Sequence, residues 1–188
     1  MDFKKELSER NLPLTEKVYR GLWQFTWLVL ASWTPNKLHF WRIFLLKIFG
    51  AKIKYSCSIY PSASIWSPKN LVMDKYSALA PGVDCYNVAK VIIGSYSTIS
   101  QRTYICTASH DYNQAEVYDN LMPLVTAEIN IKDYAWIAAE CFISPGVTIG
   151  RGSVALARSV VTKNLESSGV YVGNPARKIK DRNTVFKD

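Results

Sequence analysis

From residue 53 onward, aliphatic residues recur at intervals of six, and a small residue follows each of them four positions later. The aliphatic positions are Ile53, Ile59, Met73, Leu79, Ile93, Ile99, Ile105, Ile131, Ile137, Ile143, Ile149 and Ala155. Their small partners are Cys57, Ala63, Ser77, Val83, Ser97, Thr103, Ser109, Ala135, Cys141, Val147, Ser153 and Ser159. The last five hexads run without a slip, which indicates an internal repeat.

A second aliphatic residue often lies two positions before the first, as Val91 does before Ile93. This alternation is typical of a short strand with one apolar face. Three hexads make a coil of eighteen residues, the spacing that separates Ile131 from Ile149. The pattern predicts an all-β domain over residues 53–166, a prism of about five stacked coils that stabilise one another. A β-sandwich is the alternative, but sandwich strands do not keep a period of six.

The repeat stops after Ser109 and resumes about twenty residues later. We therefore expect a loop over residues 111–128 that protrudes from the prism. His110 stands at the edge of this loop and is one of only two histidines in the chain. A rare titratable side chain at the largest interruption of the repeat is a candidate functional residue.

Residues 1–52 have a different pattern, with Trp23, Trp27 and Trp33 at helical spacing and Pro35 interrupting the segment. Gly50 stands where a helix terminator is expected. We predict two short helices, whose aromatic stripe packs on the prism or, alternatively, lies on a bilayer. The apolar run at 22–33 is too short to span a membrane. The C-terminal tail, residues 167–188, is expected to be helical or frayed from Lys178.

The net charge of the chain limits the classes of molecule that it is expected to bind. The formal net charge is +8, and residues 17–73 contain eight Lys or Arg but no Asp or Glu. Such a balance indicates an anionic partner, a membrane surface or a phosphate-bearing molecule, or simply a solvated basic surface. The positive charge is not interleaved with a nucleic-acid-binding motif, so we expect no nucleic acid. Four cysteines without a CxxC spacing, and an N-terminus without a signal-peptide core, favour a reducing, cytoplasmic location.

Several stretches together resemble the hexapeptide-repeat acyltransferases, and among them the colanic-acid-biosynthesis type of O-acetyltransferase. The matching stretches are FWRIFLLKIFGAKI (40–53), YNVAKVIIGSYSTISQ (86–101), CTASHDYN (106–113), AWIAAECFISPGVTIG (135–150), ARSVVTKN (157–164) and GNPARKI (173–179). The resemblance implies a left-handed parallel β-helix, acetyl-CoA as co-substrate, and a homotrimer with active sites between adjacent prisms. The left hand comes from the resemblance, since crossovers between parallel strands are generally right-handed.

Acetyl transfer to a hydroxyl needs a group that accepts the hydroxyl proton near neutral pH, and a neutral imidazole suits this task. Within this framework His110 is the predicted catalytic base, and Asp111 beside it is not counted as a catalytic partner. His39, in the helical segment, is expected to be structural. Some hexapeptide-repeat proteins hold zinc with three histidines, but this chain has only two, so we expect no metal.

The resemblance also assigns binding residues. Asn87 matches an asparagine that contacts the acceptor, although a corner residue in a left-handed turn is the alternative, and Tyr86 is expected to stack on a sugar ring. Trp136 is predicted to close the thioester end of the acetyl-CoA site, with core packing as the alternative. The remaining predicted acetyl-CoA-binding residues are Ala139, Ala157, Thr162, Lys163, Arg177 and Lys180. The two alanines would admit the pantetheine arm, and the cations would bind phosphates, with ordinary surface charge as the alternative for the cations.

The sequence thus predicts an acetyl-CoA-dependent O-acetyltransferase that acts on a sugar hydroxyl of a surface or exported polysaccharide. A lipid-linked acceptor at the inner face of the membrane would suit the basic, aromatic N-terminal segment. One alternative with the same fold is an enzyme with another acceptor, which N-acetylates an amino sugar or acetylates a drug hydroxyl. The other alternative is a non-catalytic scaffold.

Overall fold

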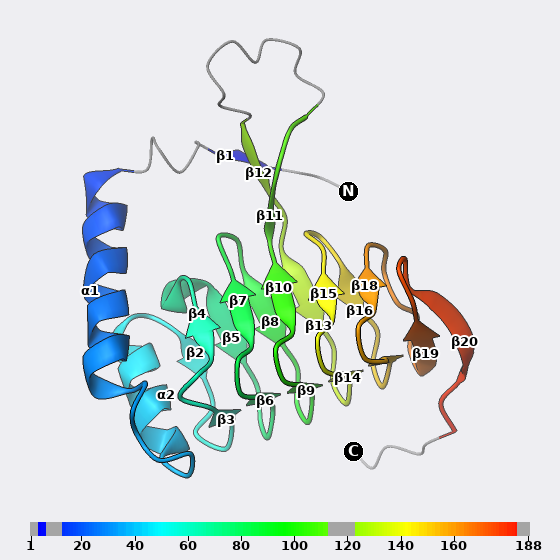
Figure 1. Ribbon diagram of the computed structural model, residues 1–188, viewed down its shortest axis with the longest axis horizontal. Coiled ribbons are helices and arrows are strands. Elements are labelled where there is room, and N and C mark those ends of the chain that lie inside the picture. The colour runs from blue at the N-terminus through cyan, green and yellow to red at the C-terminus, as the bar shows by residue number, and fades with distance from the viewer. Residues whose placement is uncertain (1–3, 7–12, 113–122, 184–188) are drawn as a thin grey trace.

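The computed structural model describes residues 4–6, 13–112 and 123–183 (Figure 1). Its main body is a left-handed parallel β-helix with three flat faces. The first face contains β2 (Lys52–Ile53), β5 (Leu71–Met73), β8 (Val91–Ile93), β13 (Ile129–Ile131) and β16 (Thr148–Ile149). The second contains β3 (Ser58–Ile59), β6 (Ala78–Leu79), β9 (Thr98–Ile99), β14 (Trp136–Ile137), β17 (Val154–Ala155), β19 (Gly169–Val172) and β20 (Arg177–Asp181). The third contains β4 (Ser64–Ile65), β7 (Asp84–Tyr86), β10 (Tyr104–Cys106), β15 (Phe142–Ile143) and β18 (Val160–Val161).

The aliphatic hexad positions stack into buried columns, as the repeat predicts. On the first face the strand register aligns Ile53, Met73, Ile93, Ile131 and Ile149. Every one of these side chains is at most 2% exposed. The described residues form five complete coils, and Leu165, which bridges to Ile149, begins a sixth. The predicted prism of about five coils is confirmed.

The corners explain why a small residue follows each strand. At three of the corners the residue just before the small one is a tyrosine with a positive φ. These are Tyr76, Tyr96 and Tyr134, at 57°, 58° and 59°. This left-handed turn directs the next side chain inward, and Ser77 and Ser97 are both fully buried. The three tyrosine rings stack from coil to coil, with centroids 5.0 and 5.1 Å apart. Ser109 departs from the pattern, because it is exposed on a strand that has already left the prism.

Two helices, α1 (Leu14–Leu30) and α2 (His39–Ile48), cover the N-terminal end of the prism (Figure 1). Trp23 is buried, and its indole nitrogen donates a hydrogen bond to the Ile65 carbonyl oxygen at 2.7 Å. Arg42 of α2 is fully buried and donates to the Ile59 carbonyl oxygen at 2.6 Å. Gly50, at φ +91°, ends α2 as the sequence predicts. No helix of the described residues combines the length and apolar character needed to cross a bilayer.

The segment that interrupts the repeat protrudes from the prism, and the two strands at its base form a β-hairpin. Strand β11 (Ala108–His110) pairs antiparallel with β12 (Leu124–Thr126), so the expected loop 111–128 is ordered at both of its ends. Residues 113–122 within it lie outside the described residues. A further strand, β1 (Lys4–Glu6), pairs with β12 and completes a three-stranded sheet. The expected helical segment 1–52 therefore also contributes a strand, which its sequence did not indicate.

The C-terminal tail differs from the helical or frayed expectation over its described residues. Strand β19 continues the second face beyond residue 166, and β20 folds back on it as an antiparallel strand. Here Lys178 lies within β20, where its ammonium group pairs with Glu166 and Asp181. The pairing with β19 satisfies the backbone that a polar sequence would otherwise expose to water.

Candidate active site

His110 lies on the base of the protruding hairpin, with its side chain exposed to solvent. In the β11–β12 register it stands opposite Leu124. The hairpin continues one step further, because the Asp111 amide donates to the Pro123 carbonyl oxygen at 2.9 Å. The imidazole is therefore carried by ordered backbone outside the aliphatic columns, and it is accessible to a substrate.

Hydrogen bonds join this hairpin to the third face of the prism. Both the amide and the hydroxyl of Thr107 donate to the Tyr86 carbonyl oxygen, at 3.1 and 3.0 Å. The Ala127 amide in turn donates to the Thr107 carbonyl oxygen at 2.9 Å. Tyr86 thus lies next to the root of the segment that carries His110.

Aromatic side chains cover the outer surface of the third face. The Tyr86 ring meets Trp66 edge-on with centroids 4.8 Å apart, and it stacks with Tyr104 at 6.5 Å. Trp66 is itself covered by the Arg20 guanidinium, 3.1 Å from the ring centroid. The half-buried Tyr86 ring is held by these contacts and is suited to an apolar ring face.

Asp84, two residues before Tyr86, is a further candidate on this face. Side chains two positions apart in a strand point to the same face, so Asp84 and Tyr86 share the outer surface of β7. Partial desolvation raises the pKa of the Asp84 carboxyl above its usual value, and a hydrogen bond with Ser64 opposes the rise. The sequence analysis missed Asp84, although the strand alternation around buried Cys85 could have revealed it.

Asn87 lies beneath the third face and does not reach its surface. The side chain is fully buried, and its oxygen accepts a hydrogen bond from the Ser67 amide at 2.9 Å. Its amide nitrogen donates to the Ser67 carbonyl oxygen at 2.7 Å. The alternative of a left-handed turn is wrong, because Asn87 is not among the residues with positive φ. In this structure Asn87 supports the neighbouring coil, and acceptor contact through it stays a prediction.

Trp136 and Lys180 come together on the second face. They line a cavity of about 390 Å³ whose other walls are Val154, Leu156, Val170, Asp181, Arg182 and Asn183. The Trp136 side chain is exposed, and its indole nitrogen donates to the Ser100 hydroxyl at 2.9 Å. The alternative that Trp136 packs in the core is therefore wrong. An exposed indole beside a lysine can bind a ligand with both apolar and anionic parts.

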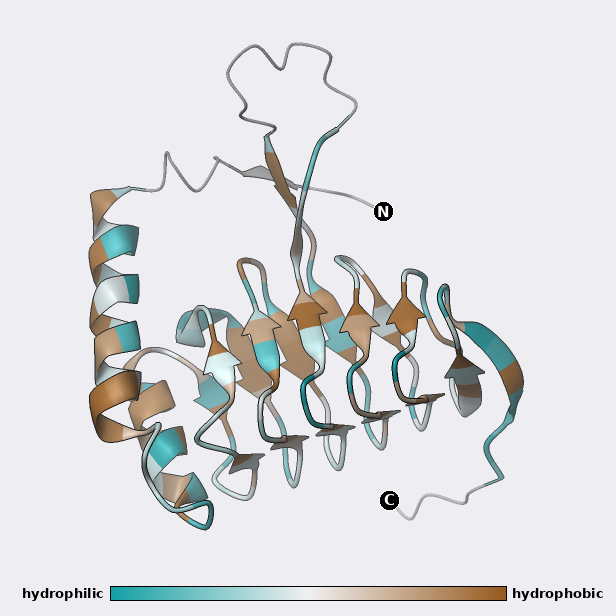
Figure 2. Ribbon diagram, viewed as in Figure 1, coloured by the Kyte–Doolittle hydropathy of each residue, from teal (hydrophilic) through white to brown (hydrophobic). Residues whose placement is uncertain are grey.

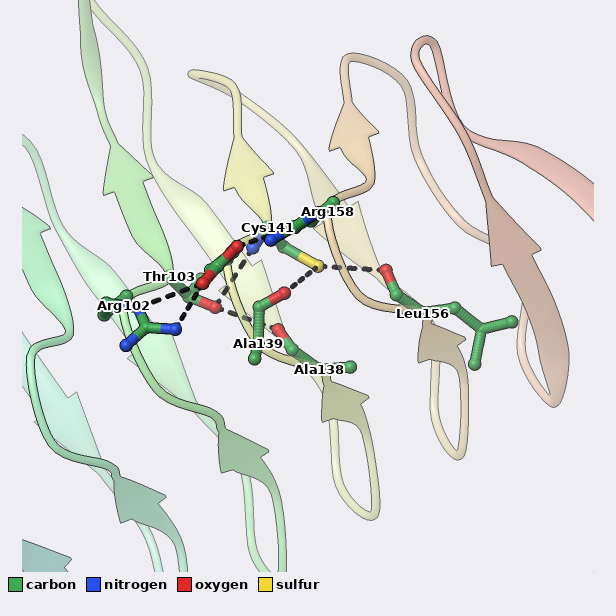
Figure 3. Close-up of polar contacts among 8 residues, drawn as sticks. Arg102, Thr103, Ala138, Ala139, Cys141, Leu156 and Arg158 are labelled. Carbon is green, nitrogen blue, oxygen red and sulfur yellow. Dashed lines mark hydrogen bonds and ion pairs between the residues drawn. The ribbon is translucent and has the colours of Figure 1, made fainter.

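Ala139 and Ala157 lie at stacked corners between the second and third faces. Each precedes a residue with positive φ, Glu140 or Arg158, and the Arg158 amide donates to the Ala139 carbonyl oxygen at 2.9 Å. The Glu140 carboxylate binds the guanidinium groups of Arg102 and Arg158 across three coils. Figure 3 shows these two arginines together with Ala139 at the stacked corners. These ion pairs lower the pKa of the Glu140 carboxyl. The small side chains of the alanines leave the backbone open beside a row of arginines.

The other predicted donor residues lie near the C-terminal end of the prism. Thr162 and Lys163 follow β18 and are exposed. Arg177 is exposed on β20, opposite Val172 of β19. None of these three lines the cavity that contains Trp136 and Lys180. The structure thus brings two of the predicted acetyl-CoA residues together and distributes the rest around one end.

His110 and the cavity with Trp136 and Lys180 belong to different faces of one chain. The hairpin with His110 rises from the third face, whereas Trp136 and Lys180 belong to the second face (Figure 1). A cavity of about 560 Å³ on the first face, lined in part by Lys52, Lys54 and Asp133, contains none of the predicted site residues. Within the described ranges, no three His, Cys, Asp or Glu side chains lie close enough to hold a metal ion.

Comparisons with known proteins agree with this architecture. No family model matches the sequence. The putative colanic acid biosynthesis acetyltransferase WcaF of Escherichia coli K12 is 40% identical over 185 residues, which cover 95% of this chain and 97% of the relative. A maltose O-acetyltransferase from Clostridium difficile 630 superposes with a TM-score of 0.80 at 25% identity, covering 92% of this chain and 90% of that one.

A hexapeptide-repeat acetyltransferase from Vibrio cholerae, solved in complex with acetyl coenzyme A, superposes with a TM-score of 0.77. It is 24% identical, and the match covers 92% of each chain. The similarity to WcaF extends over nearly the whole of both proteins, so it includes the hexad repeat and the protruding hairpin alike. This chain belongs to the colanic-acid-biosynthesis type of hexapeptide-repeat acetyltransferases.

Proposed function

We propose that the protein is an acetyl-CoA-dependent O-acetyltransferase that modifies a sugar hydroxyl during the synthesis of a surface or exported polysaccharide. The observation that carries this proposal is the exposed imidazole of His110, held on an ordered hairpin beside the aromatic third face. The reaction takes place in the cytoplasm, where acetyl-CoA is made. Membership in a family of sugar and polysaccharide acetyltransferases supports the choice of acceptor.

His110 acts as the general base of the reaction. It takes the proton of the acceptor hydroxyl as the new carbon–oxygen bond forms, and returns it to the thiolate sulfur as the carbon–sulfur bond breaks. Tyr86 supplies an aromatic surface for the apolar face of a sugar ring. Asp84 offers a carboxylate that accepts hydrogen bonds from sugar hydroxyls. Asn87 was predicted to contact the acceptor; in the structure its side chain holds the Ser67 backbone, next to Trp66, so we propose that it supports the acceptor surface from below.

Trp136 and Lys180 form the part of the donor site that a single chain assembles. Lys180, together with Lys163 and Arg177, attracts the phosphates of coenzyme A, while Trp136 covers an apolar part of the donor. Ala139 and Ala157 leave room at the corner for the pantetheine arm. Because His110 rises from another face, the full site needs a second chain, and we propose a homotrimer with one site at each junction.

The test of the reaction is a thiol-release assay with acetyl-CoA and a panel of sugar acceptors. We expect coenzyme A release that depends on a hydroxyl-bearing sugar, and a product that gains one acetyl group by mass spectrometry. Release only with amino-sugar acceptors would instead establish N-acetylation. No acceptor-dependent release, from protein that is folded by circular dichroism, would contradict the proposal.

The shared site is tested by mixing two inactive chains. A trimer formed from His110→Ala chains and Trp136→Asp chains contains junctions at which neither substitution is present, so activity should return. Each variant refolded alone should stay inactive. Failure of the mixed trimers to recover activity would mean that both residues serve a site within one chain. Light scattering measures whether the assembly has the mass of three chains.

A further inference from the structure

The outward side of α1 is apolar along its whole length, and its side chains are exposed among the residues that the structure describes. The buried residue Trp23 marks the side that faces the prism. Residues two, five or nine positions away from Trp23 lie on the opposite side, because a helix turns by 100° per residue. These positions hold Val18, Leu14, Phe25 and Leu28, which are 52%, 75%, 66% and 65% exposed.

A second exposed apolar stripe lies on α2. Its positions 40, 44 and 48 form one stripe at helical spacing, and they hold Phe40, Phe44 and Ile48, all exposed. The opposite stripe of α2, with Ile43 and Leu46, is fully buried against the first coils. Figure 2 shows the apolar colour on both helices at the end of the prism remote from β20. We call the exposed apolar residues of the two helices the helical end face.

Two exposed lysines lie on the same helical segment as the helical end face, Lys17 on α1 and Lys37 in the connection between the helices. Lys47 of α2 is also exposed, but its ammonium group donates to the Ile53 carbonyl oxygen of the prism at 3.2 Å. The only carboxylate on the two helices and their connection is that of Glu16, which pairs with Lys69. Apolar side chains accompanied by cations, with almost no acidic residue, match an interface between acyl chains and anionic lipid headgroups.

From this geometry we propose that the helical end face docks the protein on an anionic lipid bilayer. A second copy of the chain fits the face less well, because two such faces in contact would bring like charges together. Trp33, 72% exposed between the helices, is suited to the depth of the lipid headgroups. Docking leaves the prism directed away from the bilayer, and it does not depend on which acceptor the proposed reaction uses.

The test is flotation with vesicles of phosphatidylcholine alone or mixed equally with phosphatidylglycerol. The full chain should float with the mixed vesicles and only weakly with the neutral ones. The double variant Phe25→Gln/Leu28→Gln should lower the bound fraction at limiting lipid by about tenfold or more, because two apolar side chains no longer leave water. A second double variant, Phe40→Gln/Phe44→Gln, should do the same from α2.

Lys37→Gln should weaken binding to the anionic vesicles about fivefold, with little change on neutral ones. The matched control is Ile179→Gln, which removes an exposed apolar side chain of β20 at the far end of the prism and should float as the wild type does. Equal melting temperatures would show that the variants keep their fold. Failure of the wild type to float, or equal flotation of all variants, would overturn the proposal. A halved mass by light scattering in Phe25→Gln/Leu28→Gln would instead identify a second copy as the partner.

Discussion

Asn87 and Ser67 form a closed pair of hydrogen bonds between two successive coils. The Asn87 side chain accepts from the Ser67 amide at 2.9 Å and donates to the Ser67 carbonyl oxygen at 2.7 Å. It thereby satisfies the backbone of the residue just before a short 3-10 helix, Pro68–Asn70. This contact fixes the segment next to Trp66 and Tyr86, so the residue matters to the candidate acceptor surface without facing it.

Replacement of Asn87 by Ala should lower the free energy of unfolding by about 1–3 kcal/mol. The change leaves the buried Ser67 amide without a partner, which is the costly case for a lost hydrogen bond. The Ser67 carbonyl oxygen keeps one hydrogen bond, from the Asn70 amide at 3.0 Å. Denaturant unfolding measures the loss. The matched control is Asn164→Ala, which also removes a side-chain bond to a backbone amide, that of Thr148 at 2.8 Å, but at an exposed position. An equal loss in both variants would contradict the assignment of Asn87 as a buried support.

Replacement of His110 by Ala should lower turnover by about 10²- to 10⁴-fold, the usual contribution of a general base. The melting temperature should stay at the wild-type value, because the imidazole is exposed and lies outside the aliphatic columns. Steady-state kinetics with the acceptor found in the panel give the measurement. Ser109→Ala is the control, since its side chain is exposed on the same strand but points to the other side. Wild-type turnover in the His110 variant would remove this residue from the mechanism.

The ion pairs of Glu140 predict a dependence of stability on pH. Hydrogen bonds from Arg158 and Arg102 lower the pKa of the Glu140 carboxyl in the folded protein. A lowered carboxyl pKa stabilises the fold above the unfolded pKa, and this contribution disappears as the pH falls through the folded value. Wild type should therefore melt above Glu140→Gln at neutral pH, by a small margin because the site is exposed. The margin should shrink in acid and in high salt, and a margin independent of both would contradict this account.

The cysteines should resist thiol reagents in the folded protein. All four are free and buried, and burial raises the pKa of Cys85, Cys106 and Cys141. Because the thiolate is the reactive form, labelling by a disulfide reagent near pH 8 should be slow in native protein and reach four groups after unfolding. Rapid labelling of one native cysteine would show that the segment around this cysteine opens and exposes the thiol to solvent. Slow labelling also makes thiol release a clean assay of coenzyme A.

The hexad repeat determined the prism, its coil count and the inward side chains of most of its strands. It could do so because most corners need a left-handed residue followed by a small one, and most strands of the prism need an aliphatic residue inside. The sequence also marked His110 and the interruption beside it, since a repeat makes any departure visible. Trp136 and Lys180 came from the motifs of the family resemblance, and the structure brings them to one cavity.

Only the tertiary structure decided which apolar residues of α1 face the prism. Trp23 and Phe25 are both aromatic, and the helix is apolar on nearly all sides, so periodicity alone does not separate them. The pairing of β1 with β12 and the bonds from Asn87 to Ser67 join residues far apart in the chain. A local repeat specifies inside and outside for each rung, but not the contacts that form between segments outside it. For the same reason the placement of His110 and Trp136 on different faces was decided by packing.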